Sequence, residues 1–370
     1  MRVLVLGGGS VGQGIAHVLK DRFEVTVADS NKGRLDEIKK KMSVDTVNFD
    51  ISRDDPVRLM NNYDLISGAL PGKFGMKVIE AATIAGVDLV DNSFMEEDFY
   101  KLESKVKKSG ITVIPDCGIA PGLSNMIVGK MEADFGHLND VNIKVGGLPE
   151  TNVGPLGYKV VFSAVDTLDE FTREVEIVRK GKVVRTEPGE GLEYFFVNNL
   201  GSLEAFYTNG LRSLIRNISA DNMVEMTVRY RGHLEKMKLL KSLGLLSDSK
   251  IQVGDANIVP KEVLAMLMVK NLSYPDVRDI LYMEIFSTHS EKNIKDSYII
   301  TDRQDDRTGL SAMARTTGFT NAAVSKLLLE GKIKDRGIVA PELIGKIPEL
   351  FKEVEEFLTS SGIRIEHKIQ

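Results

Sequence analysis

The sequence predicts an α/β chain of two domains, a doubly wound parallel sheet followed by an α+β domain with a mixed or antiparallel sheet. Its 370 residues exceed the size at which one hydrophobic core keeps growing. In the first third, short apolar runs alternate with segments of helical period. From about residue 142 the pattern changes to that of longer, less buried strands. We place the first domain at residues 1–120 and the second at residues 121–305.

Six short runs in the first third are apolar on both faces, as strands of a parallel sheet covered by helices are. These runs are Arg2–Leu6, Glu24–Ala28, Val44–Phe49, Asp64–Ser67, Val87–Val90 and Ile111–Ile114. The segments of helical period between them are Val11–Lys20, Lys32–Lys41, Met76–Ala85 and Asp98–Lys108. The pattern predicts parallel strands joined by helical crossovers.

A glycine-rich loop follows the first expected strand and precedes the first expected helix. It reads GGGSVG, with Gly7, Gly9 and Gly12 at fingerprint spacing and Ser10 and Val11 opening the helix. The first glycine permits a tight turn, the second lets backbone approach a pyrophosphate, and the third lets helix and strand pack closely. The helix N-terminus then favours the phosphate charge. This context predicts a Rossmann dinucleotide-binding domain, and a glycine-rich turn without a ligand is the alternative.

Polar residues at the following strand ends extend the expected cofactor site. Asp29 ends the second strand, where a carboxylate accepts hydrogen bonds from ribose hydroxyls and repels a 2′-phosphate. We therefore expect NAD as the cofactor, although Lys32 and Arg34 leave room for NADP. Asp50 is placed near the adenine, with an ordinary loop acid as the alternative. The turn of Ala69, Leu70 and Pro71 is placed near the nicotinamide ribose, with a purely structural turn as the alternative.

Further polar residues follow the fifth and sixth strands. Asp91 and Asn92 end the fifth strand, and Asp116 and Cys117 follow the sixth. Ligands of open α/β sheets bind at the carboxyl edge, so we expect these residues near the site. Cys117 is expected to pack rather than to react. The stretch after Leu123 has the period of a helix.

The middle of the chain predicts a second sheet. Its expected strands are Asn142–Leu148, Tyr158–Val165, Glu174–Arg179, Lys182–Glu187, Glu193–Val197, Leu203–Thr208 and Met223–Tyr230. Expected helices are Leu211–Ile218 and Leu234–Leu243, and later Pro348–Ser360, before a last strand at Arg364–Ile369.

Two groups of residues in the second domain are candidates for binding and chemistry. Asn209 and Arg212 open an expected helix, where the dipole disfavours a cation, so Arg212 is expected to bind an anion such as a carboxylate. An intramolecular salt bridge is the alternative. His233 follows Gly232 at a strand end and titrates near neutrality. A capping or buried structural histidine is the alternative.

The composition excludes several other kinds of protein. The net charge is −5 with scattered basic residues, so neither nucleic acid nor a membrane surface is an expected partner. One cysteine and five dispersed histidines provide neither a disulfide nor a metal site. The chain begins with a strand and has no long apolar run, so we expect a cytoplasmic protein.

The motifs GGGSVG, GALPG, VDNSFM, DCGIAPGLSN, TNGLRSL and RYRGHLEKMKLL together resemble the saccharopine dehydrogenase–like family over essentially the whole chain. Within that family they look most similar to the L-lysine 6-dehydrogenase group. The resemblance implies NAD-dependent oxidation of the ε-amine of lysine to 2-aminoadipate 6-semialdehyde, which cyclises to piperideine-6-carboxylate, with release of ammonia. It also implies that residues 306–370 return to the Rossmann domain.

Such a reaction needs a group that takes a proton from the amine and then activates water. The candidates are His233, Asp91 and Asp116, in that order. Arg212, Asn209 and Asn92 are the candidates for binding the amino-acid substrate. The second domain then serves substrate binding and dimerisation, and we expect a homo-oligomer, a dimer or larger.

Two alternatives remain at this point. One is a saccharopine dehydrogenase or reductase acting on a secondary amine, whose extra carboxylates would need Arg173, Arg229 or Arg231. The other is an NAD-sensing DNA-binding regulator, because Ala314, Gly318 and Val324 have the spacing of two helices joined by a glycine turn. Mixed charge in that segment and the acidic chain argue against the regulator.

Overall fold

The computed structural model describes residues 1–161 and 163–370, without the side chain of Glu291. The chain forms two compact units. The first comprises residues 1–134, 306–310 and 314–364, and the second comprises residues 135–305, 311–313 and 365–370. The first unit therefore ends later than the expected residue 120, because residues 123–134 form a helix that packs within it. The last strand, from residue 365, belongs to the second unit.

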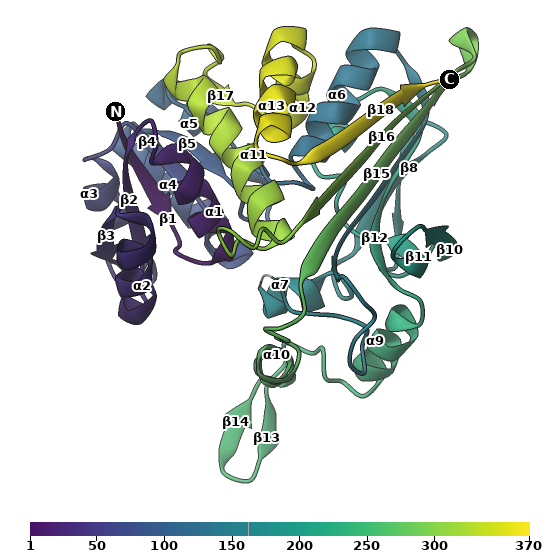
Figure 1. Cartoon of the computed structure of the whole chain (residues 1–370), viewed down its shortest axis with the longest axis horizontal. Helices are drawn as coiled ribbons and strands as arrows, with labels where there is room; N and C mark the ends of the chain where they lie inside the picture. Colours follow the sequence, from purple (N-terminus) through teal and green to yellow (C-terminus); the bar gives the residue numbers. More distant parts are fainter. Residues whose placement is uncertain (162) are drawn as a thin grey trace. The chain divides into compact units, whose positions relative to one another are not determined.

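The first unit contains a sheet in which every described pair of neighbouring strands is parallel (Figure 1). In spatial order its strands are β17 (Gly337–Ile338), β6 (Thr112–Ile114), β5 (Asp88–Asp91), β4 (Leu65–Gly68), β1 (Arg2–Leu6), β2 (Glu24–Asp29) and β3 (Asp45–Asn48). Strands β1 to β6 have the spatial order 3-2-1-4-5-6, which confirms the predicted Rossmann sheet. β17 was not predicted, because two residues are too short for a periodic signal.

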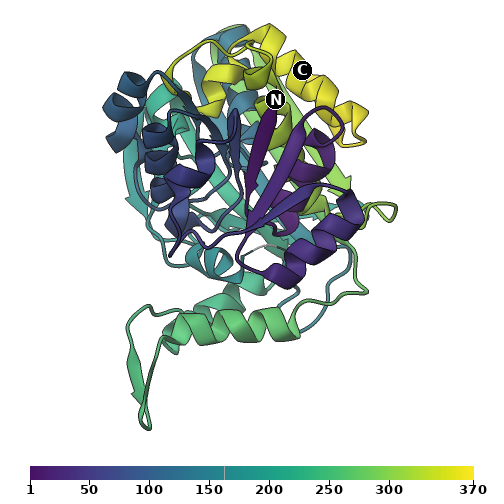
Figure 2. The same ribbon diagram turned by 90° about the vertical axis from the view of Figure 1, so that its left-hand side faces the viewer.

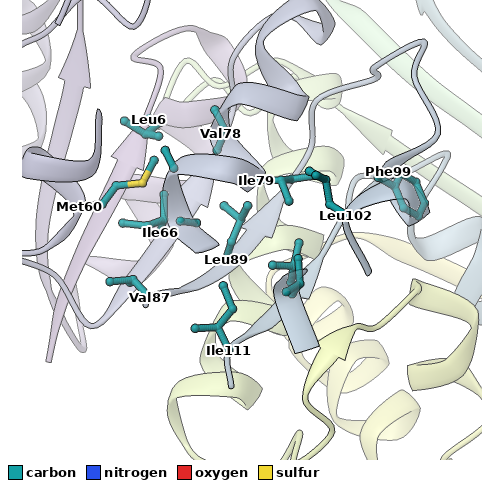
Figure 3. Packing of buried hydrophobic residues seen from close by; sticks show 14 of the residues in the cluster. Leu6, Met60, Ile66, Val78, Ile79, Val87, Leu89, Phe99, Leu102 and Ile111 are labelled. Carbon is teal, nitrogen blue, oxygen red and sulfur yellow. The ribbon is translucent and has the colours of Figure 1, made fainter. Parts of the chain in front are cut away.

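Helices cover this sheet and form the hydrophobic core with it. They are α1 (Ser10–Leu19), α2 (Lys32–Met42), α3 (Pro56–Met60), α4 (Gly75–Ala85), α5 (Glu103–Ser109), α6 (Leu123–Phe135), α11 (Ala312–Leu329), α12 (Pro341–Gly345) and α13 (Pro348–Ser360). Figure 3 shows Leu6, Ile66 and Leu89 of the strands beside Val78 and Ile79 of α4. Burial of such side chains contributes roughly 1.5–3 kcal/mol each.

The expected helix at residues 98–108 is divided in the structure. A 3₁₀ turn at Phe99–Leu102 precedes α5, and the carboxylate of Asp98 caps it by accepting from the amide of Tyr100. Phe99 and Leu102 of this turn are both buried in the core of the first unit.

Helix α11 crosses α1 at backbone contact distance. A Cβ added to Gly14 would lie 2.3 Å from the carbonyl oxygen of Ala314, and one added to Gly318 would lie 2.8 Å from that of Val11. The expected glycine turn at Gly318 is wrong, because α11 is continuous through it. Gly318 serves close helix packing instead.

The second unit contains a mixed sheet, as predicted. The main path is β10 (Glu193–Val197), β11 (Gly201–Tyr207), β12 (Ala220–Tyr230), β7 (Leu138–Pro149), β15 (Asp279–His289), β16 (Ile294–Arg303) and β18 (Arg364–Ile369), with β8 (Val175–Arg179) beside β12 and β9 (Lys182–Thr186) beside β8. β12 and β7 are parallel, whereas β15 pairs antiparallel with both β7 and β16.

Several elements of the second unit differ from the expectation. The long pair β15 and β16, helix α10 (Pro260–Asn271) and the hairpin β13 (Ile251–Val253)–β14 (Ala256–Ile258) were not predicted. The hairpin projects from this unit in Figures 1 and 2, whereas α10 packs against α7 and contributes Ala265 and Met268 to a buried cluster. The expected strand Tyr158–Val165 is wrong over its described residues, since α7 (Ala164–Asp169) begins within it. Phe162 of that run lies outside the described residues. A short apolar run does not distinguish a strand from a buried loop and helix.

The crossing of α1 and α11 generates a stability prediction. Gly14→Ala places a methyl group against the backbone of Ala314 and should lower the free energy of unfolding by about 1–3 kcal/mol. Gly33→Ala is the matched control, because its Cβ would make only an ordinary contact, 3.5 Å from Asn31 Oδ1. Urea denaturation should show loss of stability for the first variant and none for the second. Equal effects would contradict the proposed backbone contact.

Candidate functional site

Two glycines let the backbone between β1 and α1 pack closely, and a third leaves open space. Gly7 has a φ of +101°, and a Cβ on it would lie 2.5 Å from the carbonyl oxygen of Ala69. A Cβ on Gly12 would lie 1.8 Å from the oxygen of Gly7, whereas one on Gly9 would meet nothing within 4 Å. Gly9 precedes α1 without a side-chain cap, and Ser10 is exposed. The N-terminus of α1 therefore has open space beside Gly9, and its expected role in binding a phosphate group stays a prediction.

Asp29 ends β2 beside this turn. Its carboxylate accepts hydrogen bonds from the amide of Gly8 at 2.8 Å and from that of Asn31 at 2.7 Å. The guanidinium of Arg34 lies 3.1 Å away and is 43% exposed. Lys32 is also exposed at the start of α2. The acid expected to repel a 2′-phosphate and a cation that would attract one are therefore in contact.

Asp50 lies in the loop after β3 and is held within that loop. Its carboxylate accepts from the hydroxyl of Ser52 at 2.6 Å and from the amide of Ser52 at 2.9 Å. These bonds, with the nearby Arg53, hold the pKa of Asp50 below its usual value. Its expected role near the adenine stays a prediction.

The turns after β4 and β5 join the glycine turn at one edge of the sheet. The amide of Ala69 donates to Leu6, and the amide of Asn92 donates to Gly68 at 3.0 Å. The hydroxyl of Ser93 donates to the carbonyl of Leu70 at 3.2 Å. Pro71 follows on the exposed side. The structure therefore brings together the residues predicted for the pyrophosphate and nicotinamide ribose.

Asp91 is the most perturbed carboxyl described at this edge. It is fully buried, and its Oδ1 would lie 1.8 Å from a Cβ on Gly68. Burial raises the pKa of Asp91 to about 7, with a smaller contribution from the charge of Asp116, against hydrogen bonds from Ser93. Such a group exists in both protonation states near neutral pH, as an acid–base catalyst must.

Asp116 and Cys117 lie next to Asp91. Asp116 is buried and has a φ of +52°, and the amide of Cys117 donates to the carbonyl of Asp91 at 2.8 Å. Burial and the two neighbouring carboxyls raise the pKa of the Cys117 thiol. Cys117 is therefore protonated at neutral pH, consistent with packing rather than thiolate chemistry.

One face of β12 in the second unit carries a row of buried polar side chains that was not predicted. Glu225, Thr227 and Arg229 alternate with the apolar Met226 and Val228. Arg229 donates to Glu170 at 2.6 Å, and its guanidinium lies 5.1 Å above the ring of Tyr158. The alternation was visible in the sequence, because a strand sends successive side chains to opposite faces.

Glu225 holds the loop that contains Asn209 and Arg212. Its carboxylate accepts from the hydroxyl of Thr208 at 2.7 Å, and a Cβ on Gly210 would lie 2.3 Å from its Cδ. Burial raises the pKa of Glu225 to about 7. The negative charge of Glu170 adds to that shift.

Arg212 does not lie in the first turn of a helix, contrary to the expectation. Helix α8 begins at Leu214, and Arg212 precedes it with a φ of +51°. Leu211 and Leu214 are both buried, so the chain turns between two apolar anchors before the helix begins. The dipole argument for an anion at Arg212 is therefore withdrawn, and a role in binding carboxylate rests on its guanidinium alone.

His233 begins α9 (His233–Ser242) inside an aromatic cluster. Its Nδ1 lies 2.8 Å from the carbonyl oxygen of Leu156, which fixes the neutral tautomer with the proton on Nδ1. The rings of Tyr158 and Phe171 are each 5.7 Å away. Burial, with the nearby Arg229, lowers the pKa of His233 to about 3. His233 is thus a much weaker base than Asp91.

The described residues contain no group of three or more side chains that could hold a metal ion. No helix in the described part of the chain is long and apolar enough to cross a membrane.

Comparison with known proteins identifies the family. Residues 3–114 match the saccharopine dehydrogenase NADP binding domain, and residues 118–363 match the saccharopine dehydrogenase C-terminal domain. The chain belongs to the saccharopine dehydrogenase family. The match over the first unit supports a nicotinamide cofactor without distinguishing NAD from NADP.

Relatives and a solved structure agree with this family. The mitochondrial alpha-aminoadipic semialdehyde synthase of Bos taurus is 25% identical, with 98% of this chain and 48% of that protein covered. The chain thus spans about half the length of that relative. Saccharopine dehydrogenase [NADP(+), L-glutamate-forming] of Saccharomyces cerevisiae is 23% identical, with 92% and 93% covered. The solved apo structure of an L-Glu-forming saccharopine dehydrogenase from Saccharomyces cerevisiae has the same fold, with a TM-score of 0.81, 21% identity and 100% and 99% coverage.

The raised pKa of Asp91 generates a pH-dependence prediction. Folded Asp91 holds its proton up to about pH 7, whereas an unfolded aspartate releases it near pH 4. The folded chain therefore binds more protons in this window, so the contribution of Asp91 to stability falls as the pH rises from about 4 to 7. Asp91→Asn removes the titrating carboxyl and therefore this pH-dependent fall in stability.

We expect the free energy of unfolding of Asp91→Asn, relative to that of wild type, to increase by a few kcal/mol between pH 4.5 and 7.5. The expected increase is about 1.4 kcal/mol for each unit by which the pKa is raised. The control Asp36→Asn, on the exposed face of α2, should have the same pH dependence of the free energy of unfolding as wild type. A constant difference across the window for Asp91→Asn would contradict the raised pKa.

Proposed function

We propose that this chain is a nicotinamide-dependent dehydrogenase that oxidises a carbon–nitrogen bond of an amino acid, with the ε-amine of L-lysine as substrate and NAD as cofactor. The observation that carries the proposal is the edge where the glycine turn, the Ala69 turn and the buried Asp91 meet. Membership of the saccharopine dehydrogenase family supports the reaction class.

The residues present fit a dinucleotide. The end of α1 takes the pyrophosphate, where Gly9 leaves room for its oxygens. Asp29 takes the adenosine ribose, and the turn at Ala69–Pro71 takes the nicotinamide ribose. When bound, the oxidised nicotinamide supplies the hydride acceptor, which no side chain can be.

The proton chemistry falls to Asp91. An alkyl ammonium has an ordinary pKa near ~10.4 and must lose a proton before its carbon gives up hydride. Asp91, with a pKa of about 7, accepts that proton at neutral pH and releases it to solvent before water attacks the iminium carbon of the substrate. As a carboxylate again, it takes a proton from that water and passes it to the nitrogen, which leaves as ammonia. Burial is the main cause of that raised pKa, and the charge of Asp116 adds a smaller contribution. His233, with a pKa of about 3, becomes the less favoured base.

The candidates for binding the carboxylates of a substrate are arginines of the second unit, whose guanidinium groups match a carboxylate in shape and charge. Saccharopine would need cationic partners beyond Arg212, but Arg173 pairs with Asp169 at 2.9 Å and Arg229 pairs with Glu170 at 2.6 Å. Arg231, stacked 4.7 Å from the ring of Tyr194, is the remaining candidate. We assign Arg212 to the single α-carboxylate of lysine, with Asn209 beside it.

A saccharopine dehydrogenase activity is the second candidate, favoured by the names of the relatives. The alignment with the bovine protein spans 445 positions, more than the 370 residues of this chain, so that relative carries additional residues within the matched region.

The direct test follows NADH absorbance with the purified chain, NAD or NADP, and either L-lysine or saccharopine. Ammonia release with lysine supports the proposal. Glutamate release with saccharopine alone moves the reaction to the secondary-amine candidate. Dinucleotide binding without turnover of either substrate contradicts both.

Asp91→Asn should lower kcat by about 10²–10⁴-fold, the usual contribution of a general base, while leaving the Kd for NAD unchanged. His233→Asn is the matched comparison and should lower kcat far less. A larger loss for His233→Asn would return the role of base to the histidine.

Cofactor preference depends on Asp29 and Arg34. Asp29→Asn removes the charge that repels a 2′-phosphate and should raise the affinity for NADP relative to NAD by about tenfold, or about 1.4 kcal/mol. Arg34→Ala should shift the ratio the opposite way. Fluorescence titration of both cofactors measures this ratio, and no change in either variant would contradict the assignment of the ribose site.

A further inference from the structure

A buried asparagine of α11 forms the centre of a polar network at the carboxyl edge of the first sheet. Asn321 is completely buried. Its Nδ2 donates to the carbonyl of Val90 at 3.2 Å and to Oδ1 of Asn92 at 2.8 Å. Its Oδ1 accepts from the hydroxyls of Ser325, at 3.1 Å, and of Ser67. The side-chain amide of Asn321 thus donates two hydrogen bonds through Nδ2 and accepts two through Oδ1.

This network fixes the orientation of two amide groups. A backbone carbonyl can only accept, so the atom of Asn321 that faces Val90 must be the amide nitrogen. The atom of Asn92 that faces the same nitrogen must then be its oxygen. The amide nitrogen of Asn92 is therefore turned away from α11, and the assignment follows from hydrogen-bond chemistry.

The amide nitrogen of Asn92 is buried and has no hydrogen-bond partner among the residues that the structure describes. Buried donors in native proteins nearly always have a partner, so an unpaired one calls for a specific explanation. Because its oxygen is already engaged, Asn92 offers only a donor.

The position of Asn92 indicates what that donor serves. Its backbone amide bonds to Gly68, and the neighbouring Ser93 bonds to Leu70, so the β5 turn is joined to the β4 turn. The β4 turn in turn lies against Gly7. In this sheet order β1, β2 and β3 form the adenosine half, so β4 and β5 belong to the nicotinamide half.

We propose that the side-chain amide of Asn92 donates a hydrogen bond to an oxygen of the nicotinamide riboside half of the bound cofactor, and that Asn321 is the positioning residue that fixes its direction. This inference rests on the dinucleotide binding of the proposed function. It reassigns Asn92 from the substrate to the cofactor.

The test compares a whole dinucleotide with a fragment that lacks the nicotinamide half. Kd values for NADH and for ADP are measured by fluorescence and calorimetric titration. Asn92→Asp keeps the oxygen that faces Asn321 and replaces the donor by a negative oxygen. It should weaken NADH binding at least tenfold and leave ADP binding unchanged. Asn92→Ala removes the donor without adding charge, and should show the same selectivity.

Asn62→Asp is the matched control, because it adds the same charge at an exposed position after α3. Its NADH and ADP affinities should equal those of wild type. Equal weakening of NADH and ADP by Asn92→Asp would show a structural role and overturn the proposal. Unchanged NADH binding with a raised KM for the amino-acid substrate would overturn it too, by returning Asn92 to the substrate.

The positioning role of Asn321 is tested by Asn321→Ala in the same assays. With the direction of the Asn92 amide no longer fixed, the ratio of NADH to ADP affinity should fall several-fold. The effect should be absent in the Asn92→Ala background, because the two residues act through one bond. An additive effect in the double variant would overturn the positioning role. Failure of wild type to bind NADH at all would instead contradict the proposed function.

Discussion

The contact between the turns after β1 and β4 is the constraint on which the candidate site depends. Gly7 lies so close to the backbone of Ala69 that a side chain at that position would collide with its carbonyl oxygen. Gly12 in turn packs on the oxygen of Gly7. This approach places the beginning of α1 beside the ends of β4 and β5, where hydrogen bonds from Asn92 and Ser93 extend the contact. The expected phosphate site at the N-terminus of α1 and the buried carboxyl of Asp91 belong to the same edge of the sheet for this reason.

In each unit, burial raises the pKa of a carboxyl group that has no fully compensating positive charge beside it. Asp91 in the first unit and Glu225 in the second are each buried, and each has a pKa raised to about 7 mainly by loss of hydration. Asp116 increases the effect on Asp91, and Glu170 increases it on Glu225. Pairs of like charges in low dielectric are a recognised route to acid–base groups that work near neutral pH.

Local patterns made much of the first unit predictable. The glycines at positions 7, 9 and 12 have local steric reasons, and the parallel strands are apolar on both faces. Asn321 was not predictable in this way, because it contacts a residue 229 positions away and no local period links the two. The glycine at position 318 suggested a turn, whereas tertiary packing against α1 made it part of one helix. The polar row on β12 did have a signal, the alternation of Glu225, Thr227 and Arg229 with apolar residues.

A crystal structure of the chain with bound NAD tests the central claim most directly, since the account assigns each part of the cofactor to named residues. It predicts the pyrophosphate at the end of α1 beside Gly9, and the nicotinamide riboside at the edge formed by Ala69 and Asn92. A cofactor with its pyrophosphate away from α1, or with its nicotinamide on the β2–β3 side, would contradict the account.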